Sequence, residues 1–361
     1  MGEEVLRLMR EKLGADHPDT LSAMNNLAVS YGQAGRLEEA LVMREEVSRL
    51  RREKLGADHL DTLSAMNNLA MSYSDVGRLE EALGMFEEVL RLMREKLGAD
   101  HPDTLTAMGN LAVSYSDAGR LEKALGMGEE VLRLRREKLG ADHPDTLDAM
   151  GNLAISYSDT GRLEEALGME EEVLRLRREK LGADHPDTLS SMGNLAISYS
   201  DTGRLEEALV MFEKVLRLRR ENLGVDHPDT QTAMFNLASS YRQAGRWKEA
   251  LGMGEEVLRL RREKLGADHP DTLMAINNLA VTLNALGRLP DALSLLRKAS
   301  AESPVVHTGV RYHLACCECL SGNLEEAKQL ITEEIAADPK KKERALSDDD
   351  LAAIRDYIAS L

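Results

Sequence analysis

The stretch HPDTLSAMNNLAVSYGQAGRLEEALVMREEVSRLRREKLGAD, residues 17–58, decides the fold because it returns along most of the chain. Its first histidine recurs every 42 residues without a slip, at His17, His59, His101, His143, His185, His227 and His269. A unit of this size cannot bury its apolar face alone, so its copies must stack on one another. The sequence therefore predicts a solenoid, and a solenoid mainly supplies a surface for binding.

Each copy contains two segments with helical character. In the first copy, residues 18–33 carry apolar side chains at helical spacing, and Pro18 fits a first helical turn because it lacks an N–H. Asp16 or His17 could cap this helix. A second helix is expected from Leu37, with acidic residues early and basic residues late, as the helix dipole favours. A short glycine turn between the two predicts an αα-hairpin.

The phrase NLAVSYGQAGRLEEAL, residues 26–41, resembles the tetratricopeptide repeat. That repeat is usually about 34 residues long. The extra residues, about eight, lie in RLRREKLG and lengthen the second helix by about two turns. Together, NNLA, LEEAL, KLG and HPD resemble the kinesin light chain and nephrocystin type, in the subclass with nearly identical copies. The resemblance implies an all-α, right-handed α-solenoid, or superhelix, whose first helices line a concave groove.

Four segments are expected along the chain. Residues 1–14 form the second helix of a repeat that lacks its first helix, and residues 15–300 form seven repeats of the long type. Residues 304–339 form a repeat of the ordinary length, and residues 346–361 form a C-terminal capping helix. Such a helix would cover the apolar flank of the last repeat.

Two details are expected near the C-terminus. The stretch PKKKERALS, residues 339–347, should be a polar connector. Ser347 with Asp350 resembles a capping box, which would open a last helix over 348–360.

Composition narrows the possible partners. The formal net charge is −17 and the pI is about 5.1, which argues against nucleic acid and anionic membranes. No apolar run reaches the roughly 18 residues of a membrane span, and the charged start MGEEVLRLMREKL does not resemble a signal peptide. The three cysteines lie within Cys316–Cys319 and give no disulfide framework. We expect a cytoplasmic, intracellular protein.

Metal and cofactor sites are not expected. One histidine per repeat would leave neighbouring imidazoles roughly 8–10 Å apart, too far to share an ion, so a capping role is preferred. His313, Cys316, Cys317 and Glu318 bunch in one segment, but a metal site would need a second pair of ligands, and none is in view. The cysteines are better explained as small side chains buried in the core.

One asparagine recurs in the middle of each first helix, where asparagine is a poor helix former. In tetratricopeptide domains that bind peptides, the corresponding asparagine often reaches the peptide backbone. The alternative is a bond to the neighbouring helix or simple inheritance through duplication, and it has about the same weight as peptide binding. The residues are Asn26, Asn68, Asn110, Asn152, Asn194, Asn236 and Asn278.

Two neighbouring positions also face the groove by family resemblance. The position before the asparagine holds Asn25, Asn67, Gly109, Gly151, Gly193, Phe235 and Asn277. The position one turn after it holds Val29, Met71, Val113, Ile155, Ile197, Ser239 and Val281. The candidate peptide-binding residues are the seven asparagines with Val113, Ile155, Ile197 and Phe235. Kinesin light chains grip acidic, tryptophan-bearing peptides with basic groove residues, which the matching slots of this chain lack.

The second helix has a variable position of its own, held by Arg44, Phe86, Gly128, Glu170, Phe212 and Gly254. Drift at a solvent-exposed position is the preferred interpretation, and a diversified contact surface is the alternative. Glycines recur two residues earlier, at Gly84, Gly126, Gly168 and Gly252, where they could mark a close approach of helices.

No nucleophile motif, phosphate loop or metal-ligand pattern accompanies the repeats. We therefore expect a non-enzymatic scaffold that binds a peptide or a partner protein in the groove. One alternative is end-to-end self-association through the open repeat at residues 2–13, giving a homo-oligomer. Another is a sensor or adaptor arm of a larger multidomain protein.

Overall fold

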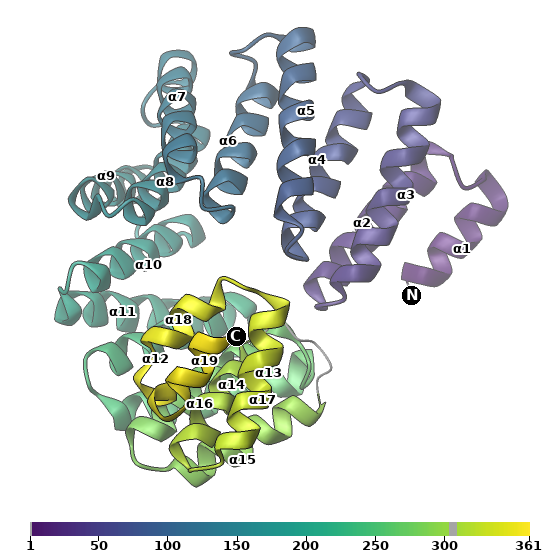
Figure 1. Cartoon of the computed structure of the whole chain (residues 1–361). Coiled ribbons are helices and arrows are strands. Elements are labelled where there is room, and N and C mark those ends of the chain that lie inside the picture. The colour runs from purple at the N-terminus through teal and green to yellow at the C-terminus, as the bar shows by residue number, and fades with distance from the viewer. Residues whose placement is uncertain (1, 303–308) are drawn as a thin grey trace. The chain divides into compact units, whose positions relative to one another are not determined.

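The computed structural model describes residues 2–302 and 309–361 (Figure 1). Within these residues all regular structure is helical. The chain divides into two compact units, Met1–Ser198 (unit 1) and Tyr199–Leu361 (unit 2). The expected start of the short repeat, 304–308, lies outside the described residues.

Unit 1 is a regular array of helix pairs. From α1 to α9, consecutive helices pack against one another, and α4 and α8 both also contact α6. The even-numbered helices are the first helices of the repeats (A helices) and line the inner side of unit 1 in Figure 1, whereas the odd-numbered ones are the second helices (B helices). They are α1 (Gly2–Leu13), α2 (Pro18–Gln33), α3 (Leu37–Leu55), α4 (Leu60–Asp75), α5 (Leu79–Leu97), α6 (Pro102–Asp117), α7 (Leu121–Leu139), α8 (Pro144–Asp159), α9 (Leu163–Leu181) and α10 (Pro186–Asp201), whose last residues belong to unit 2.

Unit 2 continues the same pattern and then changes it. Its helices are α11 (Leu205–Leu223), α12 (Pro228–Gln243), α13 (Trp247–Leu265), α14 (Pro270–Ala285), α15 (Leu289–Glu302), α16 (Val310–Leu320), α17 (Leu324–Ala337), α18 (Lys341–Ser347), the 3-10 helix η1 (Asp349–Ile354) and α19 (Arg355–Ser360). Consecutive packing of helix pairs from α11 to α17 confirms the predicted α-solenoid.

Histidine caps begin every A helix of the long repeats. In all seven copies the histidine Nδ1 accepts a hydrogen bond from the backbone N–H two residues later, at 3.1–3.2 Å. The bond satisfies one of the free N–H groups of the first turn. Of the two possible caps, His17 therefore fills the role in the first repeat, while Asp16 pairs with Lys54 at 2.7 Å. The capping interpretation of the histidines is confirmed.

Two expectations about the C-terminal segment were wrong. The polar connector is largely the helix α18, and the last helix is split into η1 and α19. Asp348, not Ser347, caps the segment by accepting the Asp350 N–H at 3.0 Å. The Ser347 hydroxyl instead donates to carbonyl oxygens of its own helix, which removes it from the capping role.

The glycines Gly84, Gly126, Gly168 and Gly252 do not mark close helix contacts. A β-carbon added to any of them would meet no heavy atom within 4 Å. The residue at the same position of α3, Val42, is 63% exposed, so this position faces solvent. The expectation of a close approach was wrong. These glycines lower helix stability at a position that faces solvent.

Candidate functional site

An apolar stripe runs along the A helices of unit 1. Five equivalent residues, each exposed by 40–52%, form it: Val29, Met71, Val113, Ile155 and Ile197. In unit 2 the equivalent positions are Ser239 and Val281, which are only partly exposed. The stripe is therefore a feature of unit 1.

Two of the repeated asparagines are bound to the neighbouring A helix. The Asn68 amide donates to the Asn25 side-chain oxygen at 3.2 Å, and the Asn110 amide donates to that of Asn67 at 3.0 Å. Each bond thus needs an asparagine at the position before the fixed one in the preceding repeat. In these two copies the structure shows the bond between neighbouring helices that was one of the alternatives.

The next two asparagines have lost this acceptor. The residues that would accept from Asn152 and Asn194 are Gly109 and Gly151, which have no side chain. Both asparagines are exposed and form no side-chain hydrogen bond within residues 2–302 and 309–361. An asparagine amide offers two donor hydrogens and an acceptor oxygen, so α8 and α10 present two unused amides beside Ile155.

The remaining candidate residues are distributed differently. Asn26 is exposed on α2, whereas Asn236 and Asn278 are partly buried in unit 2. Phe235 is covered by the Arg261 guanidinium, which lies 4.9 Å from the ring centre. Phe235 and Asn278 line a cavity of only about 10 Å³, which is too small for a peptide side chain.

The two unused amides of unit 1 border a much larger pocket. It has a volume of about 320 Å³ and is lined by residues of α8, α9 and α10. Its walls combine apolar, amide and charged groups, from Leu147, Asp148, Gly151, Asn152, Ile155, Glu170, Val173, Arg177, Ser191 and Asn194. The structure thus brings Asn152, Asn194 and Ile155 together around one opening, and Gly151 leaves room in it.

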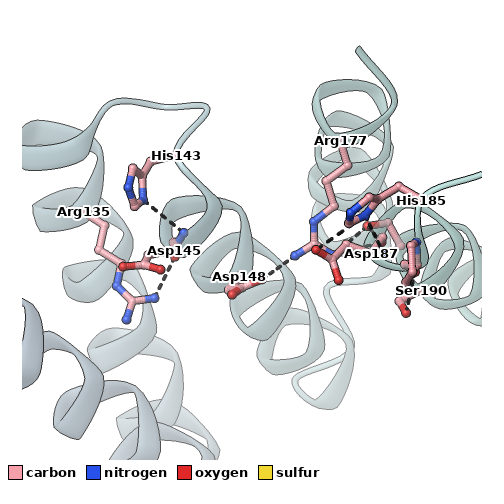
Figure 2. Close-up of polar contacts among 10 residues, drawn as sticks. Arg135, His143, Asp145, Asp148, Arg177, His185, Asp187 and Ser190 are labelled. Carbon is pink, nitrogen blue, oxygen red and sulfur yellow. Dashed lines mark hydrogen bonds and ion pairs between the residues drawn. The ribbon is translucent and has the colours of Figure 1, made fainter. Parts of the chain in front are cut away.

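Arg177 fixes one wall of this pocket (Figure 2). Its guanidinium forms an ion pair with Asp148 of α8 and donates to the Ser191 hydroxyl at 2.9 Å and to the Asp187 carbonyl oxygen at 3.3 Å. Its side chain is only 14% exposed. One repeat earlier, Arg135 donates to the Asp145 carbonyl oxygen at 2.7 Å. These arginines tie a B helix to the capped start of the next A helix.

The variable position of the B helix forms the floor between adjacent A helices. Phe86 and Phe212 are 3% exposed there and Glu170 is 6% exposed. The expectation of a solvent-exposed position was therefore wrong: the position points between two A helices, so that a serine of the next A helix lies opposite. The Ser72 hydroxyl accepts from Arg44 at 2.7 Å, and the Ser198 hydroxyl donates to Glu170 at 2.7 Å.

Sequence reasoning missed Arg177, and for Glu170 it preferred a solvent-exposed position over a contact surface. Two signals could have found them. Phenylalanine at two copies of the Glu170 position indicates burial. Methionine replaces arginine at Met93, the copy of the Arg177 position in α5, and an alternation between arginine and an apolar residue indicates a half-buried site.

A second group of polar residues lies in unit 2. Cys316, Asp348 and Asp350 place possible ligand atoms within 4.8 Å of one another, although no second ligand pair was expected beside Cys316. Asp348 accepts from the Tyr312 hydroxyl at 2.9 Å and from the Cys316 thiol at 3.8 Å. Burial raises the pKa of the Cys316 thiol well above its usual range, which keeps it protonated as a donor. The group docks η1 on α16.

His313 does not join this group through its Nδ1 atom. That atom lies 2.9 Å from the Gly309 carbonyl oxygen. Burial lowers the pKa of His313 and favours the neutral imidazole.

Comparison with known proteins agrees with this architecture. A family model for the tetratricopeptide repeat matches residues 1–53, 33–95, 61–137, 171–221, 194–263 and 229–301, and a second one matches residues 146–187. The chain therefore belongs to the tetratricopeptide repeat family. A search of curated proteins found no match.

Several solved structures resemble the chain. A variant of a Podosopora anserina protein assigned to the kinesin light chains, with nearly identical TPR-like repeats, is 28% identical, with 56% of this chain and 95% of that chain covered and a TM-score of 0.49. BtubC (BKLC) from P. vanneervenii is 22% identical, with 68% and 93% covered and a TM-score of 0.49. A tetratricopeptide repeat protein from Parabacteroides merdae is 16% identical, with 76% and 92% covered and a TM-score of 0.49.

Tetratricopeptide repeats are general scaffolds for protein interaction, and this chain is built from such repeats. None of the helices formed by the described residues has the length and apolar character needed to cross a membrane.

Proposed function

We propose that unit 1 is a non-enzymatic scaffold whose A helices bind an extended segment of a partner protein, centred on α8 and α10. The observation that carries the proposal is the pair of unused amides, Asn152 and Asn194, on either side of an open pocket. An extended peptide carries unpaired backbone N–H and C=O groups, and an amide side chain satisfies both kinds. Ile155, 52% exposed, supplies apolar contact area beside them.

The proposal distinguishes between copies of the same residue. The side-chain amides of Asn68 and Asn110 already donate a hydrogen bond to a neighbouring A helix. Their replacement should weaken the packing of adjacent A helices, whereas replacement of Asn152 and Asn194 should weaken binding and leave the fold intact.

The test is the double variant Asn152→Ala/Asn194→Ala, with a peptide or partner captured by the wild-type chain. Losing hydrogen bonds at two positions should weaken binding roughly tenfold to a hundredfold, at about 1 kcal/mol or more each. Asn222→Ala, at an exposed position near the end of α11, is the matched control. Unchanged affinity of the double variant, with an unchanged unfolding transition, would remove the asparagines from the site.

Self-association is a second candidate function. The helix α1 exposes Val5 by 47% and Leu8 by 39%, which leaves apolar area for a helix of a second copy. Sedimentation velocity over a range of concentrations tests it with the variant Val5→Ser/Leu8→Ser. A wild-type chain that stays monomeric at high concentration excludes this function.

A further inference from the structure

More acidic than basic side chains line the α8–α10 pocket. Two carboxylates, Asp148 and Glu170, and one guanidinium, Arg177, line it. The guanidinium is already paired with Asp148. We propose that this pocket accepts a lysine or arginine side chain of the bound segment, with Glu170 as its counter-charge, an inference that rests on the proposed function.

Glu170 is held in the position that such a contact needs. The side chain rises from α9 between α8 and α10, and its carboxylate accepts from the Ser198 hydroxyl at 2.7 Å. With an exposure of 6%, the residue lies at the floor, where the interaction with a cation is screened less than on an open surface.

The pocket also fits the rest of a basic side chain. Its volume of about 320 Å³ is open because Gly151 adds no side chain, and a β-carbon there would meet nothing within 4 Å. Leu147, Ile155 and Val173 give apolar walls. Long basic side chains bury their methylene stems against such walls while the charged group reaches a polar partner.

The charge belongs to one repeat only. At the equivalent floor position, the earlier repeats of unit 1 have Arg44, Phe86 and Gly128. A lysine or arginine would therefore fix the register of the bound segment on otherwise nearly identical repeats. The net charge of −17 favours the approach of a basic segment as well.

The test uses a display library of short randomised peptides, selected against the wild-type chain and against Glu170→Phe and Glu170→Gly. Phenylalanine and glycine occupy the same position in other repeats, so both variants suit the fold. We expect lysine and arginine to be enriched at one position by the wild-type chain and by the control Glu164→Gln, an exposed residue in the first turn of α9. The enrichment should be lost in both Glu170 variants.

A double-mutant cycle then measures the contact itself. Replacing the selected lysine by norleucine, which keeps the stem and removes the charge, should weaken binding to the wild-type chain about tenfold. The same replacement should change binding to Glu170→Gln by less than about twofold. Equal loss in both proteins, or no basic enrichment among peptides that need Asn152 and Asn194, would overturn the inference and leave the proposed function standing. Selection of no peptide at all, or of peptides indifferent to both asparagines, would overturn the proposed function as well.

Discussion

At the scale of single residues, the same side chain does different work according to its neighbour. The capping histidines bond alike in seven copies. The repeated asparagine is bonded in α4 and α6 but unused in α8, because a glycine has replaced its acceptor. The proposed binding site therefore lies where this repeat departs from its neighbours.

The histidine cap should be replaceable by a better one. His143→Ala removes the acceptor for the Asp145 N–H and should lower the free energy of unfolding by about 1 kcal/mol. His143→Asp restores an acceptor and adds negative charge at the helix start, so its stability should equal or exceed that of the wild type. Urea unfolding at neutral pH measures both. Equal losses in the two variants would show that the imidazole acts through packing.

Tyr115 should make unit 1 sensitive to alkali. Burial, followed by the hydrogen bond to Glu87 at 2.6 Å, raises the pKa of Tyr115 to about 12, whereas an unfolded tyrosine titrates near 10. Because the folded pKa is the higher one, this stabilisation is complete below about pH 10 and is lost as the pH rises through about 12. The loss is at most roughly 3 kcal/mol.

The measurement is the difference in unfolding free energy between the wild type and Tyr115→Phe as the pH rises. The difference should be constant below about pH 10 and shrink above it. A difference that stays constant up to about pH 12 would mean that Tyr115 titrates alike in the folded and unfolded chain.

At the scale of the element, glycines inside two helices allow the effect of a substitution on stability to be distinguished from its effect on binding. Gly168 lies inside α9 on the side facing solvent, and Gly151 lies inside α8 in the pocket wall; a β-carbon on either would meet nothing within 4 Å. Alanine at each should therefore stabilise its helix by about 1 kcal/mol. Only Gly151→Ala narrows the pocket.

Thermal unfolding and peptide binding measured on both variants test this separation. Both should raise the unfolding temperature, and only Gly151→Ala should weaken binding. If Gly168→Ala weakened binding equally, the effect would come from helix rigidity and not from the room that Gly151 leaves.

The sequence predicted the helices well and the groove floor poorly, for a physical reason. Helix starts and ends depend on local residues, such as the proline after each capping histidine, and α2 begins at Pro18 and ends at Gln33 as expected. The orientation of the floor position depends on two A helices that are distant in sequence. Phe86 is buried at the position that Glu170 occupies in α9, and a phenylalanine there indicates that the position is not a solvent-exposed one.

At the scale of the whole molecule, a repeat array stabilises itself through neighbours, so damage should stay local. Met150 of α8 is 2% exposed in the core of unit 1, and Met150→Ala should cost about 2–5 kcal/mol there. The chain has 1 tryptophan, Trp247, which lies at the start of α13 in unit 2. Its fluorescence therefore reports on unit 2, whereas circular dichroism reports on all helices.

The two probes should separate in Met150→Ala. We expect the dichroism transition to broaden and begin at lower urea, because the repeats around α8 unfold early, while the midpoint of Trp247 fluorescence moves little. A matched substitution in unit 2, Met234→Ala in α12, is also fully buried and should shift the fluorescence midpoint directly. If Met150→Ala lowered both midpoints equally, the chain would unfold as one cooperative body, and nearest-neighbour stabilisation would not describe this solenoid.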